Sequence, residues 1–178
     1  MTVDLSLNYF ALFGLPCQFN IDETALDCAW HALQAEVHPD RHAHQPDDVR
    51  RAAMQQATRV NEAYATLKKP LARAQYLLEL AGGIDAQRLN ANTVASEYLF
   101  EQLEWREAVE ETRRANDADG LEQLALRLQI QTDAILTQLA EQLGPRRDFN
   151  AAADTTQRLM FLDKLRRQID DALAAIDT

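Results

Sequence analysis

The sequence predicts an all-α protein, an antiparallel helical hairpin followed by a three-helix bundle. Apolar residues recur every three to four positions along most of the 178 residues, which is the period of an amphipathic helix. The five glycines and five prolines lie almost entirely between these periodic stretches, where they end one helix or begin the next. We expect two domains, residues 1–82 and 83–178, divided at the pair Gly82-Gly83.

Four helices are expected in the first domain. A short amphipathic segment covers residues 9–13, and the next helix begins near Asp22, whose carboxylate suits the N-cap position. That helix ends before Pro39, because the residue preceding a proline is pushed out of helical dihedral angles. A third helix begins at Pro46, and a fourth covers residues 70–80. The apolar stripes of the second and third helices are Leu26, Trp30, Leu33, Val37 and Ala53, Ala57, Val60, Tyr64, Leu67.

Three longer helices are expected in the second domain. The first covers approximately residues 93–115, the second follows Asp119-Gly120 and stops at Gly144-Pro145, and the third covers approximately residues 150–176. Helices of this length with short connections favour an antiparallel bundle. The stripes of the last two helices are Leu121, Leu124, Leu128, Ile135, Leu139 and Leu162, Leu165, Ile169, Leu173, Ile176.

The first helix of this bundle carries two apolar faces, although a helix in a three-helix bundle buries only one. The face that should enter the core consists of Tyr98, Gln102, Trp105 and Val109. The other face predicts an exposed apolar patch rimmed by charge, typical of a partner site. Its members are Leu99, Phe100, Leu103, Glu104, Arg106 and Glu107. The alternative is that a loop or the first domain covers it. Phe161, on the shoulder of the last stripe, either belongs to the core or extends the patch.

The charge of the chain disfavours several classes of partner. Its net charge is −10, whereas proteins that bind nucleic acid or anionic lipid carry an excess of Lys and Arg. Residues 81–178 hold 18 acids and 11 bases, so the second domain suits a basic protein partner. No apolar run reaches the roughly 18 residues of a membrane span, and no secretory leader is recognisable. We expect a monomeric cytoplasmic protein.

Cysteines and histidines raise the question of a metal or redox site. Cys17 and Cys28 are not arranged as C-x-x-C, and we expect both thiols to be buried or partly buried. His38, His42 and His44 allow a second interpretation, a small helical metal-binding protein. Against it, a proline interrupts the helix that would align the first two, and no cysteine or second carboxylate cluster is near in sequence. We expect no metal and no cofactor.

The tripeptide His38-Pro39-Asp40 lies at the connection between the second and third helices. No nucleophile beside a base and no glycine-rich phosphate loop accompanies it, so we do not expect an enzyme. Asp40, held by a rigid proline, suits a charge-assisted bond with an arginine of a partner, and His38 adds a polar contact. Two antiparallel helices joined by His-Pro-Asp resemble a J-domain, the part of a co-chaperone that triggers ATP hydrolysis in a DnaK-type chaperone.

Nearly the whole chain resembles the HscB family, the J-type co-chaperones of iron–sulfur cluster assembly. His-Pro-Asp alone indicates only a J-domain, and the stretches of the second domain point to this family. The matching stretches are Tyr9-Phe10-x-Leu12-Phe13-Gly14-Leu15-Pro16, Asn61-x-Ala63-x-x-x-Leu67-x-x-Pro70-Leu71-x-Arg73-Ala74-x-Tyr76-Leu77-Leu78, Glu101-Gln102-Leu103-Glu104-x-Arg106-Glu107, Ala151-Ala152-Ala153-Asp154 and Phe161-Leu162-Asp163-Lys164-Leu165.

The resemblance implies two partners. The J-domain would engage HscA, a specialised DnaK-type chaperone, and stimulate its ATPase through His38, Pro39, Asp40 and Arg41. The bundle would bind the iron–sulfur scaffold IscU and deliver it to that chaperone. The family's scaffold-binding positions fall on Leu99, Phe100, Leu103, Glu104, Arg106, Glu107 and Phe161, and six of these seven are the second face described above. A J-protein that delivers another client through the same patch is the remaining alternative.

The chain departs from the J-domain pattern in the helix before the tripeptide. J-domains usually carry a basic helix there and an aromatic residue just before His-Pro-Asp. Residues 26–37 contain no Lys or Arg, and Val37 takes the aromatic position. Positive charge is left to Arg41 and to Arg50 or Arg51. This departure predicts a dedicated chaperone partner rather than promiscuous pairing with a general DnaK.

Overall fold

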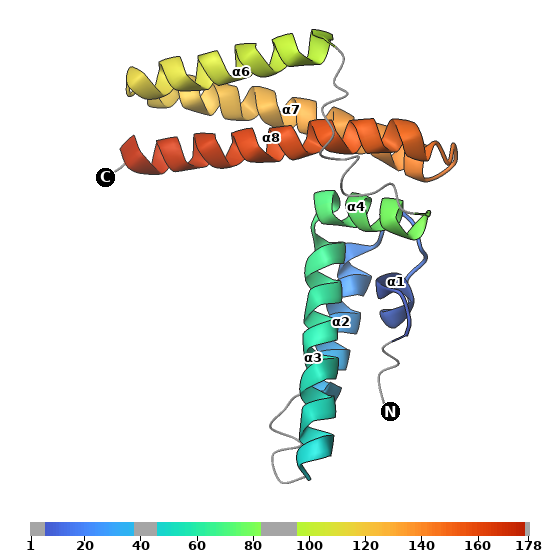
Figure 1. Cartoon of the computed structure of the whole chain (residues 1–178). Coiled ribbons are helices and arrows are strands. Elements are labelled where there is room, and N and C mark those ends of the chain that lie inside the picture. Colours follow the sequence, from blue (N-terminus) through green and yellow to red (C-terminus); the bar gives the residue numbers. More distant parts are fainter. Residues whose placement is uncertain (1–5, 38–45, 83–95, 177–178) are drawn as a thin grey trace. The chain divides into compact units, whose positions relative to one another are not determined.

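The computed structural model describes residues 6–37, 46–82 and 96–176. Throughout these residues every regular element is a helix, so the predicted all-α fold is confirmed (Figure 1). The chain divides into two compact units, Met1–Leu77 and Leu78–Thr178. The division predicted after Gly82 lies slightly farther along the chain, and because Gly83 is outside the described residues that boundary stays a prediction.

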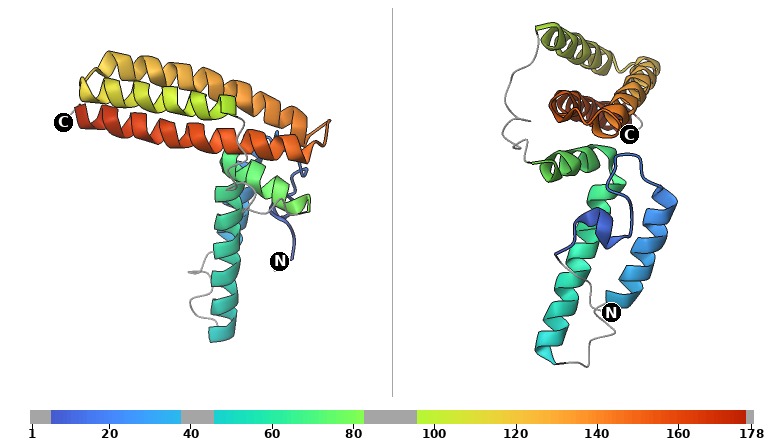
Figure 2. Two further views of the ribbon diagram at one scale, coloured as in Figure 1. Left: turned by 45° about the horizontal axis from the view of Figure 1, so that its top comes forward. Right: turned by 90° about the vertical axis from the view of Figure 1, so that its right-hand side faces the viewer.

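The first unit is built on a helical hairpin. Its helices are α1 (Tyr9–Leu12), α2 (Glu23–Val37), α3 (Asp47–Lys68) and α4 (Pro70–Leu80), the last of which continues past the division. Helices α2 and α3 pack side by side and α1 packs against α3 (Figure 2). Asp22 caps α2 as predicted, because its Oδ1 accepts from the amide nitrogens of Thr24 and Ala25 at 2.9 and 3.1 Å.

A row of polar contacts fixes the register between α2 and α3. The ring of Trp30 stacks on Tyr64 at 4.5 Å, and its Nε1 donates to Asn61 Oδ1 at 3.2 Å. The Tyr64 hydroxyl and Lys68 Nζ each donate to Asp27 at 2.9 Å. These hydrogen bonds, that of Lys68 first, hold the pKa of Asp27 below its usual range, so the carboxylate stays ionised. The contacts progress in opposite directions along the two helices, which makes the hairpin antiparallel.

Arg73 in α4 is a buried cation with only 4% of its surface exposed. Its Nε donates to the Leu67 carbonyl at 2.7 Å, one Nη donates to the Phe19 carbonyl at 2.9 Å, and the other reaches Glu23 Oε1 at 3.3 Å. Burial lowers the pKa of Arg73, and the Glu23 carboxylate opposes that shift. One planar side chain therefore ties the end of α3 to the loop before α2 and to the first turn of α2.

The second unit is the predicted three-helix bundle. Its helices are α6 (Ser96–Arg114), α7 (Ala118–Leu143) and α8 (Phe149–Ile176), and each packs against the other two (Figure 2). The cap of α7 is Asp117, whose carboxylate accepts from the Gly120 amide at 2.9 Å, so the helix already includes the pair Asp119-Gly120 that was expected to precede it. A Cβ at Gly120 would lie 2.5 Å from Thr112 Cγ2, so this first turn packs too closely on α6 for a larger residue.

The apolar stripes of α7 and α8 enter the core with three exceptions. Leu124, Leu173 and Ile176 are only partly buried. The buried members of the two stripes are Leu121, Leu128, Ile135, Leu139, Leu162, Leu165 and Ile169. None of the helices in the described part of the chain is long and apolar enough to cross a membrane.

The expectation of buried thiols is wrong, because Cys17 and Cys28 are both exposed. Cys28 follows buried Leu26 by two residues, which turns its side chain to the opposite face of α2. Cys17 belongs to the turn after α1, outside any apolar stripe. The usual preference of cysteine for protein interiors is overridden at both positions by the local geometry of the backbone.

Replacing Arg73 with Ala should lower the free energy of unfolding of the first unit by about 3 kcal/mol, because buried carbonyls lose their donors. Arg73→Lys keeps the charge but loses the planar guanidinium group. Its free energy of unfolding should lie between those of Arg73→Ala and the wild type. Urea denaturation followed by circular dichroism measures the change. Lys69→Ala, four residues earlier at an exposed position, is the control and should stay within about 0.5 kcal/mol of wild type. Equal midpoints for Arg73→Ala and Lys69→Ala would contradict the role assigned to Arg73.

Candidate functional site

Helix α6 presents large apolar side chains to solvent. Leu99, Phe100 and Leu103 are 50%, 68% and 54% exposed, so the prediction of an exposed second face is confirmed. We call these three residues the α6 patch. Glu104, Arg106 and Glu107 are exposed beside it and form a charged rim. Exposed apolar groups clustered on one helix and bordered by charge are typical of a protein-binding surface.

The opposite face of α6 anchors the helix in the bundle. Tyr98, Trp105 and Val109 are buried, as predicted, whereas Gln102 of the same predicted face is only partly buried. The guanidinium of Arg127 in α7 lies 4.7 Å from the Trp105 ring centroid, and that of Arg158 in α8 lies 5.2 Å from the Tyr98 ring centroid. These cation–π contacts hold α6 against both neighbours. Burial raises the pKa of Tyr98, which keeps its hydroxyl neutral at physiological pH.

Phe161 of α8 takes an intermediate position between the two alternatives considered for it. Its ring meets Tyr98 edge-on, with 6.0 Å between centroids and 81° between planes, which is a core contact. Its side chain nevertheless stays partly exposed. Phe161 therefore links the buried face of α6 to the surface on the α8 side.

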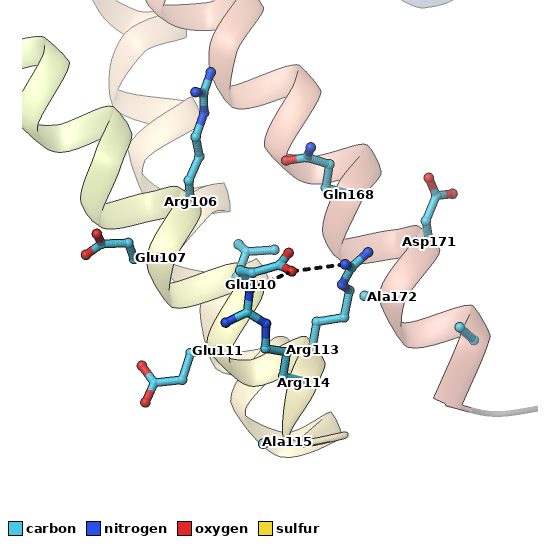
Figure 3. A pocket seen from close by; sticks show the side chains of 12 residues that line it. Arg106, Glu107, Glu110, Glu111, Arg113, Arg114, Ala115, Gln168, Asp171 and Ala172 are labelled. Atoms are coloured by element: carbon cyan, nitrogen blue, oxygen red, sulfur yellow. Dashed lines mark hydrogen bonds and ion pairs between the residues drawn. The ribbon is translucent and has the colours of Figure 1, made fainter.

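The sequence analysis missed a groove between α6 and α8. It has a volume of about 1040 Å³ and is lined by Arg106 and Glu107 of the charged rim together with residues farther along both helices (Figure 3). Periodicity along a single helix identifies an apolar face, but it does not reveal which surfaces of two helices meet. The groove can be recognised only once the packing of α6 against α8 is known.

The predicted chaperone-binding residues lie outside the described part of the chain. His38, Pro39, Asp40 and Arg41 belong to residues 38–45, as do His42 and His44 of the metal hypothesis. The helices on either side, α2 and α3, are those that were predicted. Within the described ranges, no group of three or more His, Cys, Asp or Glu side chains is placed to hold a metal ion.

Arg50 and Arg51, which were expected to supply the positive charge that α2 lacks, already make polar contacts within α3. Arg50 and Arg51 are exposed in the first turn of α3. An Nη of Arg50 lies 3.2 Å from an Asp47 carboxylate oxygen, and Nε of Arg51 donates to the Asp47 carbonyl at 3.3 Å. The ion pair is solvent-exposed, so it holds Arg50 only weakly and a partner carboxylate would compete for it.

Comparison with known proteins gives results for both units. The family model described as the HSCB C-terminal oligomerisation domain matches residues 94–170. The chain is 56% identical to a co-chaperone protein HscB homolog of Azoarcus sp. (strain BH72), over 99% of each chain. It is 51% identical to the corresponding homolog of Aromatoleum aromaticum over the full length of both. The solved structure titled chaperone HscB from Vibrio cholerae matches with a TM-score of 0.84 and 36% identity, covering 96% of this chain and 99% of that one.

The two faces of α6 should respond differently to truncation. Leu103→Ala removes an exposed side chain and should leave the free energy of unfolding within about 0.5 kcal/mol of wild type. Trp105→Ala removes a buried ring from the next turn and should lower it by roughly 3–5 kcal/mol. Urea denaturation of both variants measures the difference. A loss above about 2 kcal/mol for Leu103→Ala would show that the α6 patch is covered in solution.

Proposed function

The chain belongs to the HscB family of co-chaperones, and we propose that it stimulates ATP hydrolysis by a specialised DnaK-type chaperone, HscA, and delivers the iron–sulfur scaffold IscU to it. The role is that of a co-chaperone in iron–sulfur cluster assembly. The observation that carries the scaffold half of the proposal is the exposed α6 patch within the part of the chain that matches the family model.

The chaperone half rests on the His-Pro-Asp segment. We assign chaperone contacts to His38, Pro39, Asp40 and Arg41, with Asp40 accepting a charge-assisted hydrogen bond from a partner arginine. Phosphoryl transfer takes place on the chaperone, so this chain supplies binding energy rather than a catalytic group. Because α2 contains no Lys or Arg, electrostatic attraction along that helix is weak, and docking depends more on the tripeptide and on Arg41.

The scaffold half rests on the bundle. Leu99, Phe100 and Leu103 are the apolar anchors, since large exposed side chains at a binding surface supply most of the affinity when they become buried. The charged rim of Glu104, Arg106 and Glu107 would set orientation and association rate. Phe161 supports the patch from α8 through its contact with Tyr98.

Joining the two sites in one chain gives the delivery function a physical basis. A scaffold molecule bound to the bundle is tethered to the J-domain that engages the chaperone. Its encounter with the chaperone is then governed by an effective concentration, of order millimolar for a short tether, instead of by its concentration in solution. ATP hydrolysis is therefore triggered when the client is already nearby.

Asp40→Ala should abolish stimulation of HscA, because the partner arginine loses its carboxylate acceptor, while scaffold affinity stays within about two-fold, or roughly 0.4 kcal/mol. The steady-state ATPase rate of HscA with and without IscU measures the first quantity, and calorimetry measures the second. Asp48→Ala, an exposed acid in the first turn of α3, is the control and should stimulate normally. Undiminished stimulation by Asp40→Ala would rule out the J-domain assignment.

Leu103→Ala should weaken IscU binding by more than 1 kcal/mol, about five-fold or more, as expected for an apolar anchor. Leu126→Ala is a matched control, because Leu126 is 64% exposed on α7 and should leave the affinity within about two-fold. Isothermal titration calorimetry compares the two. Failure of the wild-type protein to bind IscU at all would instead favour a J-protein that serves another client.

A further inference from the structure

The α6 patch continues into the groove between α6 and α8. One stripe of side chains runs along α6, because its members are spaced by four, three, four and three residues. They are Leu99, Leu103, Arg106, Glu110 and Arg113. The last three of them line the groove. With a rise of 1.5 Å per residue the stripe is about 21 Å long. Patch and groove are therefore two ends of one continuous surface.

Helix α8 supplies the facing side of this surface. Phe161 meets α6 at the patch end, and Gln168, Ala172 and Ala175 line the groove farther along, again at helical spacing. Figure 3 shows Gln168 projecting from α8 toward α6. Helices α6 and α8 run in the same direction. Tyr98 near the start of α6 contacts Phe161 of α8, and residues farther along both helices line the groove together. The groove thus lies parallel to both helix axes.

Small side chains leave the groove open. Ala172 is buried and Ala175 is exposed, and Val109 and Ala115 of the α6 side complete the apolar part of the lining. Alanine side chains at these positions leave a hollow between the two helices. Val109 and Ala172 form its buried apolar floor, and Ala175 is exposed beside them.

Charged groups border this apolar floor. Glu110 Oε1 accepts from Arg113 at 3.1 Å and lies 3.4 Å from an Nη of Arg114, so these three charges largely satisfy one another. Arg106 and Asp171 form no ion pair with any side chain of the described ranges. Glu107 and Glu111 also line the groove, so the lining holds four carboxylates against the three guanidinium groups of Arg106, Arg113 and Arg114. A base is the side chain that best complements Asp171.

We propose that the groove receives a second segment of the scaffold partner, an amphipathic segment with aliphatic side chains over Ala172 and Ala175 and a Lys or Arg opposite Asp171. The inference rests on the proposed scaffold binding and extends it. Three apolar anchors fall far short of the roughly 20–30 residues a side of a specific interface, and the groove is the adjoining surface that enlarges the contact. A second copy of this chain is the competing occupant that the experiment must distinguish.

The charge experiment compares two neighbouring acids. Asp171→Lys should weaken IscU binding about ten-fold, because a like charge then faces the partner's base. Asp170→Lys makes the same change on the same turn, beside Arg166 at 3.9 Å and outside the groove, and should stay within about two-fold. Should Asp171→Lys fail to fold by circular dichroism, Asp171→Asn removes only the attraction and should weaken binding about three-fold.

The steric experiment compares two neighbouring alanines. Ala175→Phe fills the groove and should weaken IscU binding at least five-fold, whereas Ala174→Phe, exposed but outside the groove, should bind like wild type. Calorimetry with IscU gives the affinities. Stimulation of HscA in the absence of IscU should be unchanged in all five variants of the two experiments, because none alters the J-domain.

The outcomes separate this inference from the proposed function. Groove variants that bind IscU like their controls, while Leu103→Ala binds weakly, would overturn the groove proposal and leave scaffold delivery intact. Absence of wild-type binding would overturn both. Groove variants that alter only self-association in analytical ultracentrifugation would assign the groove to a second copy and overturn the proposal.

Discussion

The packing of Trp105 of α6 against α7 is the contact on which the exposed α6 patch depends. Trp105 is 2% exposed, and the guanidinium of Arg127 covers its ring. Its Nε1 has no hydrogen-bond partner in the described part of the structure, so shape and the cation–π contact hold the ring in place. This one-sided anchoring lets Leu103, two residues earlier, face solvent on a helix that remains firmly attached.

A comparable constraint acts in the first unit. The register of α2 against α3 fixes the relative positions of Val37 and Pro46, the described residues on either side of the segment 38–45. Asp27 accepts from both Tyr64 and Lys68, while Arg73 holds the first turn of α2 to the end of α3. Polar contacts with directional geometry specify a register more sharply than an alanine-rich apolar seam does alone. In each unit an arginine side chain takes part in this packing. In the first unit Arg73 contacts Glu23 in the first turn of α2, and in the second Arg127 lies over the Trp105 ring of α6.

The periodicity of apolar residues predicted most of the helices and the exposed apolar face of α6. The two faces of α6 were readable because Tyr98, Trp105 and Val109 recur at helical spacing while Leu99 and Leu103 recur on another arc. The exposed thiol of Cys28 was not foreseen, since residue type suggested burial although the position lay off the stripe of α2. The groove required knowledge of which faces of α6 and α8 meet, and a single sequence carries no direct signal for that pairing. The cap at Asp117 was likewise missed, because Asp119-Gly120 offers a similar local pattern.

The composition of the α6 surface also fits a client that must be released after delivery. At protein interfaces, buried apolar anchors act mainly on the dissociation rate and rim charges on the association rate. In the proposed site the corresponding groups are Phe100 for the anchors and Glu104 and Arg106 for the rim. A patch of three large apolar side chains, 50–68% exposed, lacks the extensive hydrophobic area of a permanent complex. The charged rim also discourages association of the patch with unrelated apolar surfaces, because docking there would desolvate unpaired charges. Exposure, modest area and charge together favour transient binding, which a delivery protein needs if each scaffold molecule is to pass on to the chaperone.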